Sequence, residues 1–163
     1  MIKLRGFDEF IKIFIKLFLI FFGIYFSTEL KTDALKEQTL FDTFINFQYK
    51  RNKNLRLFIA DEPLEKRLGL MNIKKLGSND GMIFVFNPPK NVKFWMKNTL
   101  IPLDMIFIRN NQIIEILENV MPCTKNICEL FGPDEIVDFV IEINSGKTKE
   151  IGLKKGDYIE IKL

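Results

Sequence analysis

Apolar and polar residues alternate through most of the chain after residue 43, with the period of two that is typical of half-buried β-strands. The predicted strands cover residues 44–49, 55–60, 82–86, 92–97, 105–108, 113–117, 136–143 and 158–162. One of them, residues 82–86, is apolar on both faces, which indicates an interior strand of a sheet. Pro88 and Pro89 are expected to end it.

Turn and cap residues divide this pattern into a small β domain. Asn110 and Asn111 predict a tight hairpin between the strands at 105–108 and 113–117. Asp61 at an N-cap position and proline two residues later predict a helix over residues 62–68, and a second short helix is expected to end at Gly152. About eight short strands with two short helices predict a mainly β protein, a small antiparallel barrel or sandwich.

The N-terminus carries an uninterrupted apolar run at residues 17–26, preceded by Lys12 and Lys16. Its length suits the core of a signal peptide, which needs about 7 to 15 apolar residues. An uncleaved membrane anchor over residues 10–26 is the alternative, and a buried helix of the domain a third. We therefore expect three parts: a signal peptide or anchor over residues 1–34, a linker to about residue 42, and one domain over residues 43–163. The domain is expected to be exported to a periplasmic, lumenal or extracellular location.

Charge and composition narrow the function. The chain has a net charge of +3, of which residues 1–16 contribute +2, so the remainder carries only +1. Proteins that bind nucleic acid through phosphates show a clearer basic excess, so no nucleic acid partner is expected. The chain contains no histidine, which excludes Ser-His-Asp and Cys-His catalysis and histidine-based metal sites. We expect no metal and no cofactor.

Cys123 and Cys128 are the only cysteines of this 163-residue chain. Because the chain is expected to be exported, a disulfide between them is the expected state. Closing so small a ring would restrict a loop rather than hold the fold together. Redox catalysis and a reduced pair are the alternatives; the Cys-x4-Cys spacing differs from the Cys-x2-Cys of redox motifs.

Residues 94–105 place polar groups between apolar strands. In an extended segment Trp95 and Lys97 share one face, where they offer a stacking or cation-binding surface, although a lone tryptophan more often fills a core. The side chains of Lys97, Asn98 and Asp104 are placed to converge at one end of the sheet. The alternative is a turn network, in which Asp104 accepts backbone N–H groups and Asn98 and Thr99 cap the loop.

Motifs along residues 43–163 resemble the DUF192 family. They lie at residues 68–71 (LGLM), 80–86 (DGMIFVF), 94–105 (FWMKNTLIPLDM), 140–146 (VIEINSG) and 151–157 (IGLKKGD). The resemblance implies a small β-barrel or sandwich, often exported, without an established activity or assigned catalytic residues. The cysteine loop resembles that of a subset of the family.

The polar residues of these motifs are either one pocket or an internal network of ion pairs and hydrogen bonds. The candidate binding residues are Arg67, Trp95, Lys97, Asn98, Thr99, Asp104 and Glu142. Their first expected function is that of a non-catalytic binding module for a small polar ligand, a sugar or an anionic metabolite. The alternatives are an accessory protein at the outer face of a membrane, and an enzyme that uses Asp104 or Glu142 as acid or base with Lys97 or Arg67 stabilising negative charge.

Overall fold

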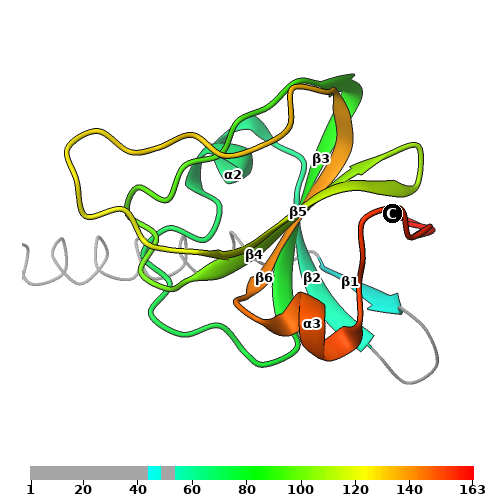
Figure 1. Ribbon diagram of the computed structural model, residues 1–163, viewed down its shortest axis with the longest axis horizontal. Helices are drawn as coiled ribbons and strands as arrows, with labels where there is room; N and C mark the ends of the chain where they lie inside the picture. Colours follow the sequence, from blue (N-terminus) through cyan, green and yellow to red (C-terminus); the bar gives the residue numbers. More distant parts are fainter. Residues whose placement is uncertain (1–43, 49–53) are drawn as a thin grey trace, which may run out of the picture. The chain divides into compact units, whose positions relative to one another are not determined.

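Six strands form one sheet in the computed structural model, which describes residues 44–48 and 54–163 (Figure 1). Their order across the sheet is β1 (Phe44–Gln48), β2 (Asn54–Ala60), β3 (Asp80–Lys90), β6 (Val137–Asn144), β4 (Leu103–Arg109) and β5 (Gln112–Val120). These residues belong to a unit that spans Asp42–Leu163. The expected signal peptide or anchor and its linker lie outside the described residues.

The prediction of a closed barrel or a two-sheet sandwich is wrong, because the described strands form a single open sheet. It is also not purely antiparallel. β2 and β3 pair in parallel, whereas the other neighbours pair antiparallel. The chain between β2 and β3 contains helix α2 (Pro63–Leu68), and this crossover returns the chain to the end of the sheet from which β2 started.

Two of the eight predicted strands are absent from the described sheet. Residues 92–97 make only isolated bridges, Phe94 with Phe131 and Lys97 with Cys123, and the C-terminal segment bridges at Tyr158 alone. β3 is longer than predicted and continues through its two prolines to Lys90. Proline has no N–H to donate to a neighbouring strand. Both prolines lie between Val85 and Lys90, where the pairing of β3 with β6 is irregular.

Other local predictions are confirmed. The hairpin of β4 and β5 turns at Asn110 and Asn111, whose φ angles are both positive, 49° and 61°. Helix α2 is present but begins one residue later than predicted, so Asp61 as its N-cap is wrong. The N-cap is Glu62, whose backbone N–H donates to Glu65 Oε2 at 3.1 Å. No helix among the described residues is long and apolar enough to span a membrane.

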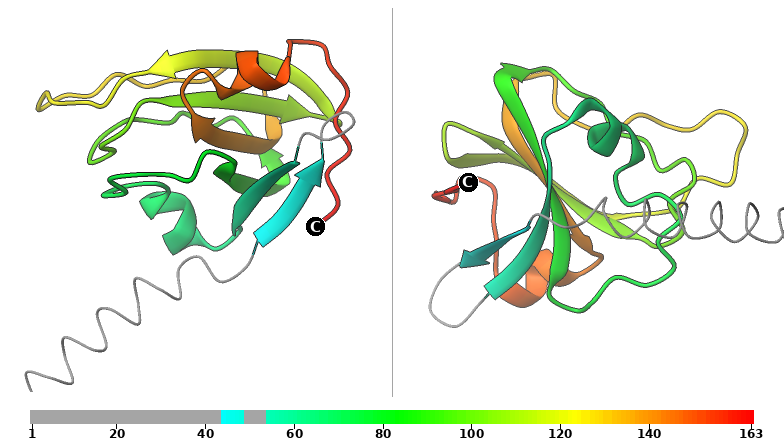
Figure 2. Two further views of the ribbon diagram at one scale, coloured as in Figure 1. Left: turned by 90° about the horizontal axis from the view of Figure 1, so that it is seen from below. Right: turned by 180° about the vertical axis from the view of Figure 1, so that it is seen from behind.

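Both faces of the sheet are covered, and the two helices of the described residues, α2 and α3, lie on opposite sides of it (Figure 2). Helix α3 (Lys147–Ile151) contributes to an aliphatic core that contains Ile83, Ile106 and Ile141. The opposite face of the same strands presents sulfur and aromatic side chains, among them Met82, Phe84, Met105 and Phe107, all at most 1% exposed. Packing on both faces explains why residues 81–84 of β3, most of β6 and all of β4 up to Ile108 are buried.

Two long connections run side by side along that second face (Figure 1). One is the segment between β3 and β4, residues 91–102, and the other is the segment between β5 and β6. Phe94 of the first and Phe131 of the second exchange two backbone hydrogen bonds. The Phe94 ring packs edge-on against Phe84, with ring centroids 4.9 Å apart. These contacts fix the residues around Trp95 relative to the sheet although they form no regular strand.

Candidate functional site

A small hollow of about 30 Å³ lies where α2, the β3–β4 connection and β6 meet. We call it the Arg67 hollow. Its lining residues are Lys66, Arg67, Leu68, Gly69, Leu70, Met71, Phe84, Phe94, Trp95, Thr99 and Glu142. Of the seven candidate residues it thus brings together Arg67, Trp95, Thr99 and Glu142, from three elements that are far apart in the sequence. Its volume is enough for one water-sized group.

Glu142 is the buried carboxyl group of this hollow. In β6 it lies opposite Met82 of β3 and Met105 of β4, and directly paired residues of neighbouring strands point to the same face. Its side chain therefore stands between two thioethers, which replace little of the hydration that a carboxylate loses. Glu142 is 5% exposed, and burial raises its pKa to about 8. At pH 7 the carboxyl group is mostly protonated and can donate a hydrogen bond.

Arg67 is the available cation beside this carboxyl group. It is exposed on α2, and none of the ion pairs within the described residues includes it. Its neighbour Lys66 instead donates to the carbonyl of Asp61 and lies 5.5 Å from the centroid of the Phe86 ring. Arg67 therefore keeps its five donors for a ligand or for water.

Trp95 is 45% exposed, so the interpretation of this tryptophan as a core filler is wrong. The alternation predicted for residues 92–97 holds even without a strand, because Met96 is 1% exposed whereas Trp95 and Lys97 face outward. Lys97 Nζ lies 5.5 Å from the centroid of the Trp95 ring, a cation–π contact. One face of the indole is thus taken by Lys97, and the ring forms a wall of the Arg67 hollow.

Two further candidates serve the loop that carries Trp95. Asn98 has a φ of 59°, and its carbonyl accepts the Asn72 N–H at 2.8 Å. Thr99 is 7% exposed, forms a bridge with Met71 and borders the hollow. Asn98 and Lys97 are not among the lining residues.

Asp104 lies on the other side of the sheet. In register it pairs with Ile143, so it points to the face opposite Glu142. Its carboxylate accepts hydrogen bonds from the backbone N–H groups of Asn119, Gly146 and Thr148 at 2.9–3.1 Å and from the Thr148 hydroxyl at 2.6 Å. It is fully buried. This is the network alternative of the sequence analysis, and it holds the start of α3 on β4.

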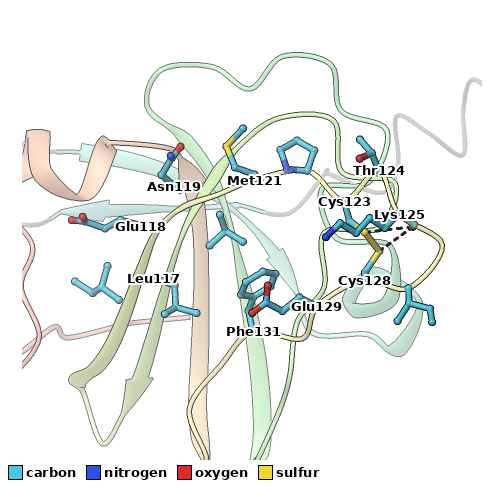
Figure 3. A pocket seen from close by; sticks show the side chains of 14 residues that line it. Leu117, Glu118, Asn119, Met121, Cys123, Thr124, Lys125, Cys128, Glu129 and Phe131 are labelled. Atoms are coloured by element: carbon cyan, nitrogen blue, oxygen red, sulfur yellow. Dashed lines mark hydrogen bonds between the residues drawn. A yellow bond between two sulfur atoms is a disulfide. The ribbon is translucent and has the colours of Figure 1, made fainter.

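The cysteine loop lies beside a separate and larger hollow. Cys123 and Cys128 form a disulfide. The hollow has a volume of about 720 Å³ and is lined by fourteen residues between Ile116 and Phe131. The disulfide lies at one end of it and Glu118 and Asn119 at the other (Figure 3). In the described part of the chain, no three Cys, Asp or Glu residues are grouped as a metal site would require.

The sequence patterns and this geometry agree with a comparison to known families. The DUF192 family model, described as "Uncharacterized ACR", matches residues 45–161. The chain belongs to the DUF192 family. The match covers all of the described sheet except Phe44, including the strands that carry Glu142 and Asp104.

Two solved structures are similar to this DUF192 chain. A protein of unknown function from Novosphingobium aromaticivorans DSM 12444 is 32% identical, with a TM-score of 0.64, over 73% of this chain and 84% of that one. A proposed transcription regulator from Sinorhizobium meliloti 1021 is 35% identical, with a TM-score of 0.59, over 66% and 81% of the two chains. Among curated proteins, none matches the chain. These likenesses support the fold and leave the activity open.

Sequence reasoning missed the aromatic residues around the site. Phe84 and Phe86 belong to an apolar run that indicates only an interior strand, and Lys66 lies in a short helix without a distinctive pattern. All three line cavities next to Arg67. For the two phenylalanines, the only signal in the sequence is their spacing of two residues within the apolar run 82–86, which places both rings on one face of a strand.

Proposed function

We propose that this DUF192 protein is a non-catalytic binding module for a small anionic ligand, which binds Arg67 and places one oxygen atom in the Arg67 hollow. A single observation carries the proposal: Arg67 and the buried carboxyl group of Glu142 line the same hollow. Arg67 has no ion-pair partner among the described residues. Arg67 supplies positive charge and a planar fork of donors that matches a carboxylate or phosphate.

A protonated Glu142 makes the site suitable for an anion. In the ionised form it would repel a ligand carboxylate, whereas with a pKa of about 8 it carries a proton at pH 7 and donates it in a hydrogen bond. The ligand then receives N–H groups from Arg67 and one O–H from Glu142. Trp95 and Thr99 complete the wall with an apolar ring and a hydroxyl.

Binding is favoured over catalysis by the composition of the hollow. Glu142 is the one carboxyl group among its described lining residues, so the second carboxylate of a paired acid and base is missing. The alternative acid, Asp104, already accepts four hydrogen bonds on the opposite face. We do not propose transcription regulation, the role in the name of the Sinorhizobium relative. Residues 17–163 carry a net charge of only +1, which gives no basic excess for binding DNA.

An accessory role at a membrane surface is the second candidate, and one feature favours it. Met121, Ile127 and Leu130 of the cysteine loop are 60%, 87% and 61% exposed. The disulfide is in keeping with an oxidising compartment, and hence with export directed by residues 17–26. Ile127→Ser should reduce co-sedimentation with membranes if the loop docks there, and unchanged sedimentation would count against this role.

Calorimetric titration of the purified chain with acetate, phosphate and a neutral disaccharide at pH 7 tests the binding proposal. We expect the anions to bind and Arg67→Gln to weaken them about 10- to 100-fold, since a hydrogen bond to a charged group contributes about 1.5–3 kcal/mol. Lys154→Gln, which removes an exposed cation outside the hollow, is the matched control and should bind normally. Equal binding by the Arg67→Gln chain would refute the proposal.

A further inference from the structure

A second hollow adjoins the Arg67 hollow and extends it along the surface. It has a volume of about 210 Å³. The two share Lys66, Arg67, Phe84, Phe94 and Trp95, so they are two compartments of one depression. The smaller compartment ends at Glu142, and the larger one is bounded by Phe86, Val92 and Lys93.

The larger compartment is aromatic, and we call it the aromatic compartment. Four of its eight lining residues are Phe84, Phe86, Phe94 and Trp95. Phe84 and Phe94 are fixed against each other edge to face. Ring faces and edges of this kind favour a planar unsaturated ligand over an aliphatic one, because offset or edge-on contacts between rings stabilise the complex beyond the burial of apolar surface.

The cations of this compartment differ in availability. Lys93 Nζ donates to the carbonyls of Gly132 and Pro133 at 2.7 and 2.9 Å and pairs with Asp134 at 2.9 Å. Lys66 donates to the backbone of the chain before α2. Arg67 remains, and it lies at the junction of the two compartments. A ligand anion is therefore expected at the junction, with the rest of the ligand in the aromatic compartment.

The volume limits the size of that remainder. An apolar cavity of about 150 Å³ accommodates benzene, and 210 Å³ is larger than this but below the roughly 300 Å³ at which sites for drug-sized molecules begin. From the shared arginine, the aromatic lining and the volume, we propose that the ligand is a small aromatic carboxylate. Its carboxylate contacts Arg67 and Glu142, and its single ring lies against Trp95 and Phe86. This inference rests on the proposed anion site and adds the chemical class of the ligand.

Three probes separate the ring from the charge: benzoate has both, acetate has only the carboxylate, and benzamide has only the ring. Titrated into the purified full-length chain at pH 7 and followed by calorimetry, benzoate should bind at least tenfold more tightly than either of the others. Phe86→Leu should bring benzoate to within about threefold of acetate and leave acetate unchanged, because it removes the ring and keeps an apolar side chain. Tyr158→Leu, at a 69% exposed tyrosine outside both compartments, is the matched control and should change neither.

The outcomes distinguish the two proposals. If benzoate and acetate bind equally and both need Arg67, the anion site stands and the aromatic class is overturned. If neither binds, the anion site is overturned as well. If benzamide binds as tightly as benzoate, the ring is recognised without the charge, and the assignment of the carboxylate to Arg67 is wrong. Loss of benzoate binding in the Tyr158→Leu chain would also overturn the placement of the ring.

Discussion

Replacing Glu142 by glutamine should stabilise this protein at neutral pH. Burial raises the pKa of Glu142 from 4.5 to about 8 in the folded chain, so between these values the native state holds a proton that the unfolded chain has released. The free energy of unfolding therefore falls as pH rises through this window. Each unit of the shift corresponds to about 1.4 kcal/mol. Glu142 accordingly costs about 3 kcal/mol at pH 7 and about 5 kcal/mol above pH 8, relative to its protonated form.

Glutamine has nearly the shape of the protonated side chain and does not titrate. The two proteins should thus be equally stable at pH 4, and Glu142→Gln should become more stable by the amounts above as pH rises. Urea unfolding at half-unit steps between pH 4 and 8.5, followed by the fluorescence of Trp95, the only tryptophan, measures the difference. Other groups titrate in both chains and cancel. Glu160→Gln, at an exposed glutamate, is the matched control and should give a flat difference.

A flat difference for Glu142→Gln would refute the reasoning, since it would mean that Glu142 ionises in the fold as it does in the unfolded chain. The same change also bears on binding. The groups around Glu142 are Met82 and Met105 on the neighbouring strands, Lys66 and Arg67 on α2, and Trp95 and Thr99 on the connection; the charged ones are Lys66 and Arg67. Anion affinity should therefore fall above about pH 8 in the wild type and stay level in the glutamine variant.

Three further changes have defined expectations. Asp104→Asn turns an NH₂ group toward N–H and O–H donors and should lower the free energy of unfolding, measured in urea, by about 3 kcal/mol. Asp134→Asn, at a fully exposed carboxylate, is the control and should leave the urea midpoint unchanged. Equal urea midpoints for the two variants would contradict the hydrogen-bond network around Asp104. Gly81→Ala places a Cβ 2.5 Å from a backbone oxygen of β6 and should cost about 1–3 kcal/mol in the same assay; a neutral result would show that the strands can separate. Replacing Cys123 and Cys128 by serine should cost about 2 kcal/mol, and the oxidised protein should lose as much on reduction; a change of less than half that size would mean that the loop is held by its other contacts.

Local structure could be predicted wherever neighbouring residues decide it. The turn at Asn110 and Asn111 and the end of α3 before Gly152 depend on backbone conformations that few residue types adopt, so the sequence marks them. The closed barrel and the strand at residues 92–97 could not be predicted correctly. The alternation of apolar and polar residues over 92–97 shows only that one side of the segment is buried and the other exposed. An irregular segment that is hydrogen-bonded to Phe131 produces this pattern as readily as a strand does.

The candidate site shows the same division. Sequence alone placed Glu142 inside an apolar strand and Asp104 directly before another, and made each a candidate for one pocket. Only the tertiary structure decided that the register of β4 against β6 turns them to opposite faces. Asp104 then meets the start of α3, more than forty residues away, and its charge is satisfied by N–H and O–H donors. Glu142 lies between two thioethers and lines one hollow with an arginine from α2. A difference of one position in strand pairing thus separates a structural carboxylate from the candidate binding group, because a side chain's neighbours across a sheet depend on register rather than on adjacent sequence.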